Sequence, residues 1–577
     1  MKDLSFSVQF FKDVWHLTKS YWQSEEKKKA FLLLGCIIAL TLGIVYMLVQ
    51  LNAWNNRFYT ALQDYKTDKI FDELLNFSML AAAYIIMAVY SYYLQQTLIL
   101  NWRRWLTERF LGTWLNNRTY YQLQMFGEDT DNPDQRISED VRMFVEMTLN
   151  FSIGILRSMC TLISFVFILY NLSGAISFTF LGREWTINGY MFWTALGYSI
   201  IGTYITHLVG RKLVQLNFIQ QRYEADFRFS MIRLRENAES VAFYKGESHE
   251  QQVFSSRFKL LLDNFWRLIS KQKQLIWLNS GYSQIAIIFP FVVAMNRYLA
   301  REITLGGLMQ VSSAFSNVQT ALSYFADMYA NIAQWQAVVI RLTFFEHHVQ
   351  EVAVDTEQFY LTRIMDGDKV AADNMQVDLP DGSPLLENMD FVFSPGNNVL
   401  IKGVSGSGKS TLLRAISGIW PYVKGKLSIP DSSQLMFIPQ KPYLPLGSLR
   451  AALLYPGNRP LEDAELVQLM DLCHIGYLKE KLDVVADWGQ VLSVGEQQRL
   501  AFVRAHIQSP EWLFLDEATS ALDEETEADM YTLAAQRLKD TTIVSVGHRS
   551  TLNRFHRLQL YLNRDTHSVK MTPVIGE

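Results

Sequence analysis

The feature that most constrains the fold is a glycine-rich stretch of the form G-x-x-x-x-G-K-[ST]. It follows an apolar run at residues 399–401, typical of a buried strand, and precedes residues 412–416, typical of the start of a helix. In that setting the loop presents backbone N–H groups and a helix N-terminus to negative charge. The stretch therefore predicts a nucleotide phosphate loop. Its residues are Gly403, Val404, Ser405, Gly406, Ser407, Gly408, Lys409, Ser410 and Thr411.

Two side chains of this loop have expected chemical roles. Lys409 is expected to reach the β- and γ-phosphates, and the Ser410 hydroxyl is expected to bind Mg²⁺. A chance Gly/Ser-rich turn is the alternative, but it does not account for the strand before the loop and the helix after it. ATP and Mg²⁺ are therefore the expected ligands.

The composition indicates a membrane protein with more than one domain. Of 577 residues, 49% are hydrophobic and 19% are charged, whereas soluble proteins carry about 25% charged residues. The formal net charge of -4 gives no reason to expect nucleic acid as a partner. Cys36, Cys160 and Cys473 are far apart and lack metal-ligand spacing, so we expect small buried hydrophobic residues rather than a disulfide or metal site.

Six apolar segments are long enough to cross a bilayer, which requires about 20 residues. The first follows a polar, lysine-bearing N-terminal region that lacks the cleavage site of a signal peptide. The sixth is the weakest, because polar residues interrupt it. The expected spans are residues 30–51, 77–100, 148–178, 190–209, 276–298 and 305–332.

Lysine and arginine residues near the span ends orient these segments, because such residues are enriched on the cytoplasmic side of membranes. They concentrate in residues 12–29 and in the connections after the second and fourth spans. The other connections are short and contain fewer positive charges. Both termini are therefore expected in the cytoplasm, where the phosphate loop has access to ATP.

The chain is expected to divide into a membrane part and a soluble part. Residues 1–350 would form an all-α domain with six spans and long cytoplasmic helices, and residues 351–374 would form a linker. Residues 375–577 have the strand and helix pattern of a soluble α/β domain. The expected fold class is therefore a six-span helical membrane domain fused to an α/β domain with a phosphate loop.

Two stretches of the cytoplasmic connections have recognisable turn signals. Residues 236–246 predict a helix stopped by Gly246, an exposed bend suited to docking on the soluble domain. Residues 131–136 predict a turn that opens a helix at Ile137. An ordinary solvated helix or loop explains either stretch equally well.

Polar residues recur three or four positions apart along the sixth span, so they share one helix face. Within a membrane such a face usually looks toward a bundle interior or a water-filled path. We expect a cavity wall, with interhelical hydrogen bonding as the alternative. Arg157 in the third span and Glu146 just before it are further candidates for intramembrane charge. The polar stripe comprises Gln310, Ser313, Asn317, Thr320 and Asp327.

Five motifs in one order carry a resemblance to a known family. The phosphate loop is followed by Gln440, LSVGEQQR at residues 492–499, LFLDEATSALD at residues 513–523 and VGHR at residues 546–549. This order resembles the ATPase domain of ATP-binding cassette (ABC) transporters over about residues 375–577. The membrane half contains DNPDQRISED and ENAESVAFYKGE. It resembles the SbmA/BacA-like bacterial transporters with a fused ATPase and the subfamily D half-transporters of peroxisomes and lysosomes.

The resemblance implies catalytic roles for four residues. Asp516 would hold Mg²⁺ through water, and Glu517 would be the general base that polarises the attacking water. Two carboxylates can divide these roles because the metal neutralises one of them. His548 would contact the γ-phosphate and orient the water. Gln440 would bind the metal, sense the nucleotide and pass the signal to the membrane half.

The resemblance also implies that two copies build each ATP site. Ser493 and Gly495, at a helix N-terminus, would contact the γ-phosphate bound to the other subunit. Asp523 would line the seam between the subunits. A homodimer with two hydrolytic sites is expected, and a heterodimer with a related half-transporter is the alternative.

The chain departs from the family pattern in two places. The usual signature LSGGQ has Val494 and Glu496 here, and Glu496 adds a negative charge near the seam that can alter ATP turnover. The adenine-stacking position, often aromatic, holds Leu379. Stacking is therefore expected to be weaker or to come from another residue.

These features predict an exporter-like, ATP-driven transporter in the lipid of a bacterial inner membrane. The polar stripe favours a peptide-like, hydrophilic or amphipathic solute, while the resemblance leaves acyl-CoA or lipid cargo, and either direction of transport, open. An ATP-gated channel or a membrane sensor is the alternative from another class, and an organelle half-transporter is a third. The intact Glu517 and His548 favour repeated hydrolysis, and hence a pump.

Overall fold

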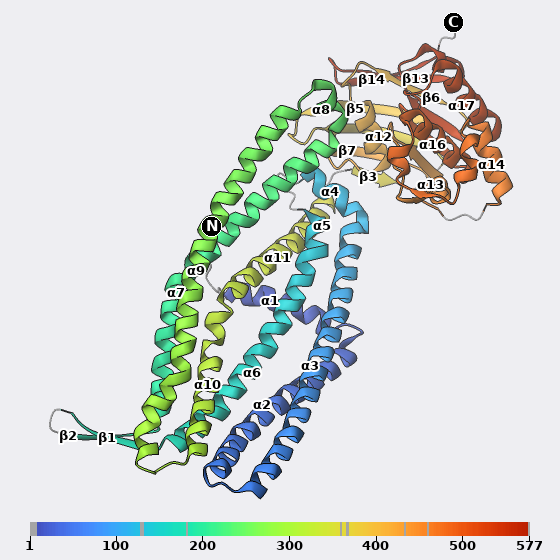
Figure 1. The fold of residues 1–577 in the computed structure, drawn as a ribbon. Coiled ribbons are helices and arrows are strands. Elements are labelled where there is room, and N and C mark those ends of the chain that lie inside the picture. Colours follow the sequence, from blue (N-terminus) through green and yellow to red (C-terminus); the bar gives the residue numbers. More distant parts are fainter. Residues whose placement is uncertain are drawn as a thin grey trace. The chain divides into compact units, whose positions relative to one another are not determined.

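The computed structural model describes residues 8–126, 132–180, 183–357, 361–364, 368–431, 434–457 and 461–574. Its contacts divide the chain into two compact units, and Figure 1 labels many of their elements. The first unit comprises residues 1–112 and 131–346, and the second comprises residues 113–130 and 347–577. Asp131 and parts of the expected linker, residues 358–360 and 365–367, lie outside the described residues.

The first unit is built from long helices and, in its described part, one antiparallel hairpin. The hairpin pairs β1 (Ala175–Phe180) with β2 (Arg183–Asn188). The helices that lie wholly or mainly in this unit are α1 (Val8–Trp22), α2 (Lys27–Gln63), α3 (Thr67–Leu115), α5 (Pro133–Gln135), α6 (Val141–Ser173), α7 (Tyr190–Glu236), α8 (Ala238–Tyr244), α9 (Glu247–Leu299), α10 (Leu305–Asp327) and α11 (Tyr329–Glu357).

Four helices in the described part of the chain are long and apolar enough to cross a membrane: α2, α3, α6 and α9. Each overlaps one expected span. The expected spans at residues 190–209 and 305–332 also lie in helices, which are not among these four. The sequence predicts a third span up to residue 178, but α6 ends at Ser173. Gly174 has φ 65° and ψ -156°, a conformation open essentially to glycine alone, and it turns the chain into β1.

Helix α10 is central to the first unit, because it packs against α2, α6, α7 and α9. It approaches α2 so closely that a Cβ at Gly306 would lie 2.0 Å from the carbonyl oxygen of Asn56. Asn52 Nδ2 donates to the Gln310 carbonyl at 2.9 Å, and Asn56 Nδ2 donates to Gln310 Oε1 at 2.7 Å. Gln310 of the polar stripe therefore joins two helices. The apolar face of α10 buries Leu308, Val311, Ala314, Phe315 and Val318.

The bend expected at residues 236–246 is present but is built differently. Helix α7 ends at Glu236, and α8 is a separate short helix. The residue that stops α8 is Lys245, which is left-handed with φ 52°, whereas Gly246 precedes α9 with φ -83°. The predicted glycine stop is therefore wrong. Lys245 and Gly246 both donate their N–H groups to carbonyls of the last turn of α8, which offsets the strain of the positive φ.

A buried ion cluster ties the start of α6 to α11. Residues Arg136–Asp140 form one π-helical turn, and the buried carboxylate of Asp140 accepts from Arg136. Arg341 on α11 donates to the same carboxylate from two nitrogen atoms, at 2.6 and 2.9 Å. The helical region expected to open at Ile137 begins earlier, with Pro133 in its first turn. The DNPDQRISED stretch therefore contributes a structural ion cluster.

The second unit contains two main sheets. The larger one has strand order β14-β13-β6-β12-β11-β8, with the strands from β13 to β8 parallel and β14 antiparallel. The smaller one has order β3-β7-β4-β5, and β9 pairs separately with β10. The strands are β3 (Leu361–Ile364), β4 (Val370–Asp378), β5 (Pro384–Phe393), β6 (Val399–Gly403), β7 (Val423–Ser428), β8 (Leu435–Ile438), β9 (Gly447–Ser448), β10 (Val485–Ala486), β11 (Trp512–Asp516), β12 (Thr542–Val546), β13 (Leu558–Asn563) and β14 (Ser568–Pro573).

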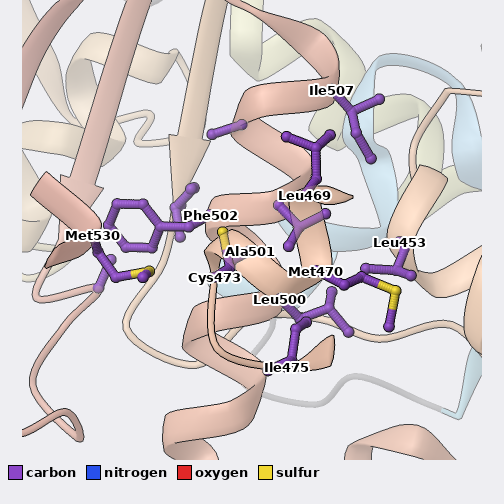
Figure 2. Packing of buried hydrophobic residues seen from close by; sticks show 14 of the residues in the cluster. Leu453, Leu469, Met470, Cys473, Ile475, Leu500, Ala501, Phe502, Ile507 and Met530 are labelled. Carbon is purple, nitrogen blue, oxygen red and sulfur yellow. The ribbon is translucent and has the colours of Figure 1, made fainter. Parts of the chain in front are cut away.

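Helices cover both faces of the larger sheet. Successive residues of a strand point to opposite faces, and here both faces carry apolar side chains that need cover. On β11, Leu513 and Leu515 enter one core, while Trp512 and Phe514 enter the other. Figure 2 shows the first core, where the middle of α16 packs against residues of α14. The helices of this unit are α4 (Thr119–Phe126), α12 (Lys409–Ser417), α13 (Leu449–Leu454), α14 (Asp463–Leu472), α15 (Trp488–Val491), α16 (Val494–Gln508) and α17 (Glu524–Arg537).

A piece of the first cytoplasmic connection belongs to the second unit. Asn117 and Arg118 have φ of 51° and 60°, so the chain turns sharply between α3 and α4. Arg118 Nη1 donates to the Ser417 carbonyl at 3.1 Å, and Met125 packs against the core that contains Trp420. Residues 116–126 therefore dock on the α/β domain, a role that the sequence did not indicate for this stretch.

We predict that Asp140→Asn destabilises the first unit by about 2–4 kcal/mol, because two guanidinium groups lose a shared buried carboxylate. This loss is smaller than the range of about 3–5 kcal/mol for a broken buried pair, since the Arg341 side chain is 34% exposed. Glu146→Gln is the control, because Glu146 pairs with Arg142 at 3.3 Å on the surface. Unfolding of the detergent-solubilised protein measures both variants, and equal losses would contradict a structural role for the cluster.

Candidate nucleotide site

The phosphate loop connects β6 to α12, as the sequence predicts. Gly408 caps the N-terminus of α12 with φ 90°, in the left-handed region that favours glycine. A Cβ at Gly403 would lie 2.6 Å from Ser407 Oγ and 2.7 Å from the Leu562 carbonyl oxygen, so a larger residue does not fit. The first N–H groups of α12 have no helical acceptor, which makes this helix start an anion site.

Lys409 is buried, and its ammonium group folds back on the loop. Its Nζ donates to the carbonyl oxygens of Gly403 at 3.0 Å and Val404 at 3.1 Å. Burial lowers the pKa of Lys409, although the nearby carboxylates of Glu517 and Asp516 oppose that shift. A phosphate is a stronger, charged acceptor than a carbonyl, so it can replace these two contacts.

Ser410 and Asp516 meet at the ends of α12 and β11, where Ser410 Oγ donates to Asp516 Oδ1 at 2.9 Å. Burial raises the pKa of Asp516, and the charge of Glu517 adds to the rise, while the hydrogen bond from Ser410 opposes it. A cation bound nearby would therefore stabilise the ionised form of Asp516. The hydroxyl and carboxylate oxygens fit Mg²⁺, which usually takes few protein ligands together with phosphates and water. Within the described residues, no group of three or more His, Cys, Asp and Glu could hold a metal by itself.

Glu517 lies between Gln440 and His548. Gln440 Nε2 donates to Glu517 Oε2 at 3.2 Å, and His548 Nε2 lies 3.2 Å from Glu517 Oε1. The three residues follow the adjacent strands β8, β11 and β12. Glu517 has φ 49°, a strained conformation of a kind that is concentrated at functional sites. Gln440 was expected to contact the metal, and its amide nitrogen is directed at Glu517.

The signature residues Ser493 and Gly495 form the start of α16. A Cβ at Gly495 would lie 3.1 Å from the carbonyl oxygen of Ala521, so this helix start packs closely against the loop that follows β11. No hydrogen bond joins Ser493 or Gly495 to the phosphate loop of the same chain in the part that the structure describes.

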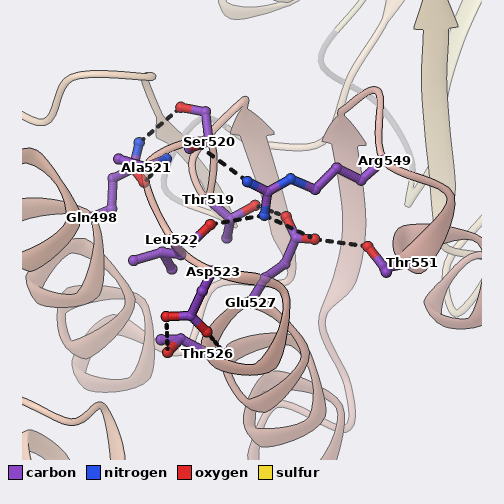
Figure 3. A network of polar contacts seen from close by, with 10 residues as sticks. All are labelled: Gln498, Thr519, Ser520, Ala521, Leu522, Asp523, Thr526, Glu527, Arg549 and Thr551. Carbon is purple, nitrogen blue, oxygen red and sulfur yellow. Dashed lines mark hydrogen bonds and ion pairs between the residues drawn. The ribbon is translucent and has the colours of Figure 1, made fainter.

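Gln498, to which the sequence assigned no role, connects three motifs, and Figure 3 shows most of its contacts. It is fully buried on α16. Its Nε2 donates to the Gln440 carbonyl at 3.0 Å and to Ser520 Oγ at 3.2 Å, while its Oε1 accepts from the Ala521 N–H at 3.0 Å. One side chain thus ties the segments after β8 and β11 to the signature helix.

Arg549, also unassigned from the sequence, holds the same loop from the other side (Figure 3). Its Nη1 donates to the Leu522 carbonyl at 2.8 Å and lies 3.6 Å from the buried carboxylate of Glu527. Glu527 in turn accepts from Thr519 at 2.6 Å and Thr551 at 2.9 Å. The residue types alone do not distinguish Gln498 and Arg549 from surface residues, because their role depends on which loops converge on them.

Two further residues from the sequence analysis have local structural roles. Asp523, expected at a subunit seam, caps α17 and accepts from the Thr526 N–H at 2.8 Å. Leu379 begins a turn in which its N–H donates to the Ser383 carbonyl at 2.8 Å. Leu385, on the strand that follows, lies against the phosphate loop, 3.0 Å from a Cβ built at Gly408. An aliphatic side chain is therefore adjacent to the loop.

A helical membrane unit joined to an α/β unit with this loop and these carboxylates defines a membrane transporter with its own ATPase domain. Two family comparisons agree with that class. Residues 17–299 match the family described as "ABC transporter transmembrane region 2", and residues 386–520 match the family described as "ABC transporter".

Relatives match along nearly the whole chain. An ABC transporter ATP-binding protein of Haemophilus influenzae is 37% identical over 96% of this chain and 93% of its own length. The "Inner membrane ABC transporter ATP-binding protein YddA" of Escherichia coli is 34% identical, over 92% of this chain and 94% of its own. The human "Lysosomal cobalamin transporter ABCD4" is 28% identical, over 97% and 95%. A solved bacterial Atm1-family ABC exporter with ATP bound shares the fold, with TM-score 0.73, 17% identity and 96% coverage of both chains.

The chain therefore belongs to the ABC transporters, and its relatives include subfamily D members. It is a half-transporter in layout, with one membrane region fused to one ATPase domain, and it couples ATP hydrolysis to transport. The predictions of fold class, family and enzyme class are confirmed.

We predict that Gln498→Leu lowers kcat for ATP hydrolysis by roughly tenfold or more, because the Ala521 N–H and the Gln440 carbonyl lose their partner and the loop after β11 loses its position. ATPase assays of the purified protein in lipid discs measure this effect. Gln508→Leu is the control on the same helix, because the Gln508 side chain is exposed and makes one long contact, at 3.4 Å, to the Tyr455 carbonyl. Equal activities of the two variants would contradict the positioning role.

Proposed function

We propose that the chain forms a homodimeric ABC transporter that moves an uncharged hydrophilic or amphipathic solute across a bacterial inner membrane. The solute class is argued from one observation, a cavity in the first unit whose lining combines uncharged polar side chains with apolar ones. The location is argued from the Escherichia coli relative, which is described as an inner membrane protein. The positive charges near the span ends favour a cytoplasmic location for both termini.

The cavity has a volume of about 470 Å³, within the usual range for small-molecule sites, and lies among α2, α9 and α10. No Asp, Glu, Lys, Arg or His is among the described residues that line it. Its lining residues are Asn55, Tyr59, Ser283, Ala286, Ile287, Phe291, Met309, Ser312, Ser313, Ser316 and Gln319.

The serine hydroxyls of this cavity are available to a solute. Ser312, Ser313 and Ser316 make no side-chain hydrogen bond to the described residues, whereas Ser152 on α6 donates to the carbonyl four residues before it at 2.7 Å. Serines in membrane helices commonly make that internal bond. A hydroxyl group that has no bond within the protein can donate to and accept from a guest with hydroxyl or amide groups.

Helix α9 contributes a further acceptor to the cavity. Pro290 lies inside this helix and has no N–H, so the carbonyl of Ala286 lacks its usual helical partner. Ala286 lines the cavity, beside the apolar residues Ile287 and Phe291. The wall therefore combines acceptors with apolar surface, which suits an amphipathic molecule whose contacting part is neutral.

The polar stripe of the sequence analysis divides between two uses. Ser313 lines the cavity, together with neighbours outside the stripe. Gln310 bonds to α2, and Asn317 Nδ2 donates to the Ser313 carbonyl at 2.9 Å. The side chain of Asp327 lies outside the described residues.

We assign Glu517 as the general base for the attacking water, since its carboxylate is at a strand end and 28% exposed. Gln440 and His548 orient that carboxylate and turn to water and the γ-phosphate when ATP binds. Lys409 exchanges its two carbonyl contacts for the phosphates. Ser410 and Asp516 would hold Mg²⁺, which neutralises phosphate charge during the reaction.

The homodimer is argued from the incompleteness of one copy. The chain has one phosphate loop and one signature, and among the residues that the structure describes no hydrogen bond joins Ser493 or Gly495 to the phosphate loop of the same chain. A second copy can supply its signature to that loop, giving two identical sites. The alternative is a heterodimer with a related half-transporter. A fully active dimer purified from this chain alone would rule out that alternative.

Coupling to the membrane unit is argued from two short segments. Residues 116–126 pack with the ATPase unit. In the first unit, α8 exposes Phe243 by 78% and Tyr244 by 86%, which is unusual for aromatic residues of a folded bend. We propose that these two side chains dock on an ATPase domain and follow its closure.

We predict that Glu517→Gln lowers ATP turnover by roughly 100-fold or more, because the attacking water loses its base. Flux of a radiolabelled cargo into or out of proteoliposomes should stop with it. Glu511→Gln is the control, since Glu511 accepts from Gln434 at 2.9 Å before the same strand. Undiminished cargo flux in the Glu517→Gln variant would contradict the pump and would favour an ATP-gated channel.

We predict that the triple change of Ser312, Ser313 and Ser316 to Ala raises the half-maximal cargo concentration by about tenfold or more, because each of the three lost hydrogen bonds is worth about 0.5–1.5 kcal/mol. Cargo-stimulated ATPase activity across neutral peptides, cobalamin-like compounds, acyl-CoA and lipids measures it. Ser152→Ala is the control, since that hydroxyl is bonded within its helix. Stimulation by a polyanion such as acyl-CoA, unaffected by the triple change, would contradict the solute class.

A further inference from the structure

In a single copy of the chain, the hydroxyl group of the signature residue Ser493 already has a hydrogen-bond partner. Ser493 caps α16, and its hydroxyl donates to Glu496 Oε2 at 2.6 Å, while its backbone N–H donates to the same oxygen at 2.7 Å. The Glu496 N–H lies 3.3 Å from the Ser493 hydroxyl oxygen and completes a capping box. Glu496 is one of the two residues by which this signature departs from LSGGQ.

A second residue holds the carboxylate from the other side. Tyr477, on the short helix Gly476–Lys481, donates its hydroxyl to Glu496 Oε1. Burial raises the pKa of Glu496, but the bonds from Ser493 and Tyr477 outweigh burial, so the net pKa is below the usual range. The carboxylate is therefore ionised and has partners on both oxygens.

The chemistry of the hydroxyl makes this arrangement consequential. A serine hydroxyl has one proton to donate, and here it donates to an ionised acceptor. Hydrogen bonds to a charged acceptor are about twice as strong as those between neutral groups. A γ-phosphate that approaches Ser493 must displace the carboxylate, and it must do so against the repulsion of two anions.

We propose that Glu496 is a positioning residue that holds the Ser493 hydroxyl away from nucleotide and so sets the ATP concentration at which two copies close. This inference rests on the proposed homodimer, in which Ser493 serves the phosphate loop of the second copy. Closure exchanges the carboxylate of Glu496 for the γ-phosphate as the acceptor of the Ser493 proton. The cost of that exchange is paid at binding, so it affects the apparent KM for ATP more than kcat.

A purely structural reading treats the capping box as stabilisation of α16 and nothing more. Gln at position 496 separates the two readings, because glutamine also completes a capping box while it lacks the charge. The thermal stability of Glu496→Gln should therefore match that of the unaltered protein. In this variant the hydrogen bond from the Ser493 hydroxyl to residue 496 is weaker, and residue 496 no longer repels the γ-phosphate.

The test is ATP titration of hydrolysis by the full-length protein in lipid discs. Glu496→Gln should lower the apparent KM for ATP by roughly three- to tenfold, the difference between a charged and a neutral acceptor, with kcat changed by less than about twofold. Glu465→Gln is the matched control, since Glu465 is in the first turn of α14 and the charge change is the same. An unchanged or raised KM in Glu496→Gln would overturn the proposal.

A double-mutant cycle separates two effects of Glu496, its hydrogen bond with the Ser493 hydroxyl and its charge repulsion of the γ-phosphate. In the Ser493→Ala background the effect of Glu496→Gln on KM should shrink toward none, because the held hydroxyl is absent. An equal effect in both backgrounds would overturn the positioning role. If the homodimer proposal itself is wrong, the result is a different one. The protein purified without another half-transporter would then hydrolyse no ATP, whatever residue stands at position 496.

Discussion

The nucleotide site depends on one geometric constraint, the parallel alignment of β6, β12, β11 and β8. Parallel strands bring their carboxyl ends to one edge of a sheet, which is where such folds bind their ligands. The phosphate loop follows β6, His548 follows β12, Glu517 follows β11 and Gln440 follows β8. Residues more than a hundred positions apart in the chain therefore meet within hydrogen-bonding distance of one carboxylate.

The loops at this edge are held by a few buried polar side chains. Gln498 bonds to backbone groups after β8 and β11, and Arg549 bonds to the loop after β11 and to Glu527. Because the partners are backbone atoms and buried groups, these two side chains fix the positions of the loops relative to one another. The same principle operates at Ser493, where a carboxylate three residues away determines whether a hydroxyl is free to meet a phosphate.

The membrane unit is organised around α10, which has two different faces. One face packs apolar side chains into the core, and the other presents serine hydroxyls to a cavity shared with α2 and α9. The ends of this unit are secured by polar contacts of another kind. Gln310 joins α10 to α2, and Asp140 joins two arginines at the start of α6. Hydrogen bonds and ion pairs in this unit therefore position helices, while the serine hydroxyls of the cavity bond to none of the described residues, and we propose that they bind the solute.

The sequence by itself determined the fold class, the family, the phosphate loop and the candidate residues at the strand ends. These depend on local patterns, such as a glycine-rich loop between a strand and a helix, which can be recognised without knowing the neighbours. It did not determine that Lys245 rather than Gly246 stops α8, because residue type favours glycine in the left-handed conformation that ends a helix, whereas here Lys245 adopts it.

Only the tertiary structure decided which polar residues line a cavity, that Gln498 and Arg549 hold the loops, and that Glu496 occupies the signature serine. Each of these roles depends on distances between segments separated in the chain, or on the orientation of a side chain within a turn. Neither quantity is encoded in residue type or spacing.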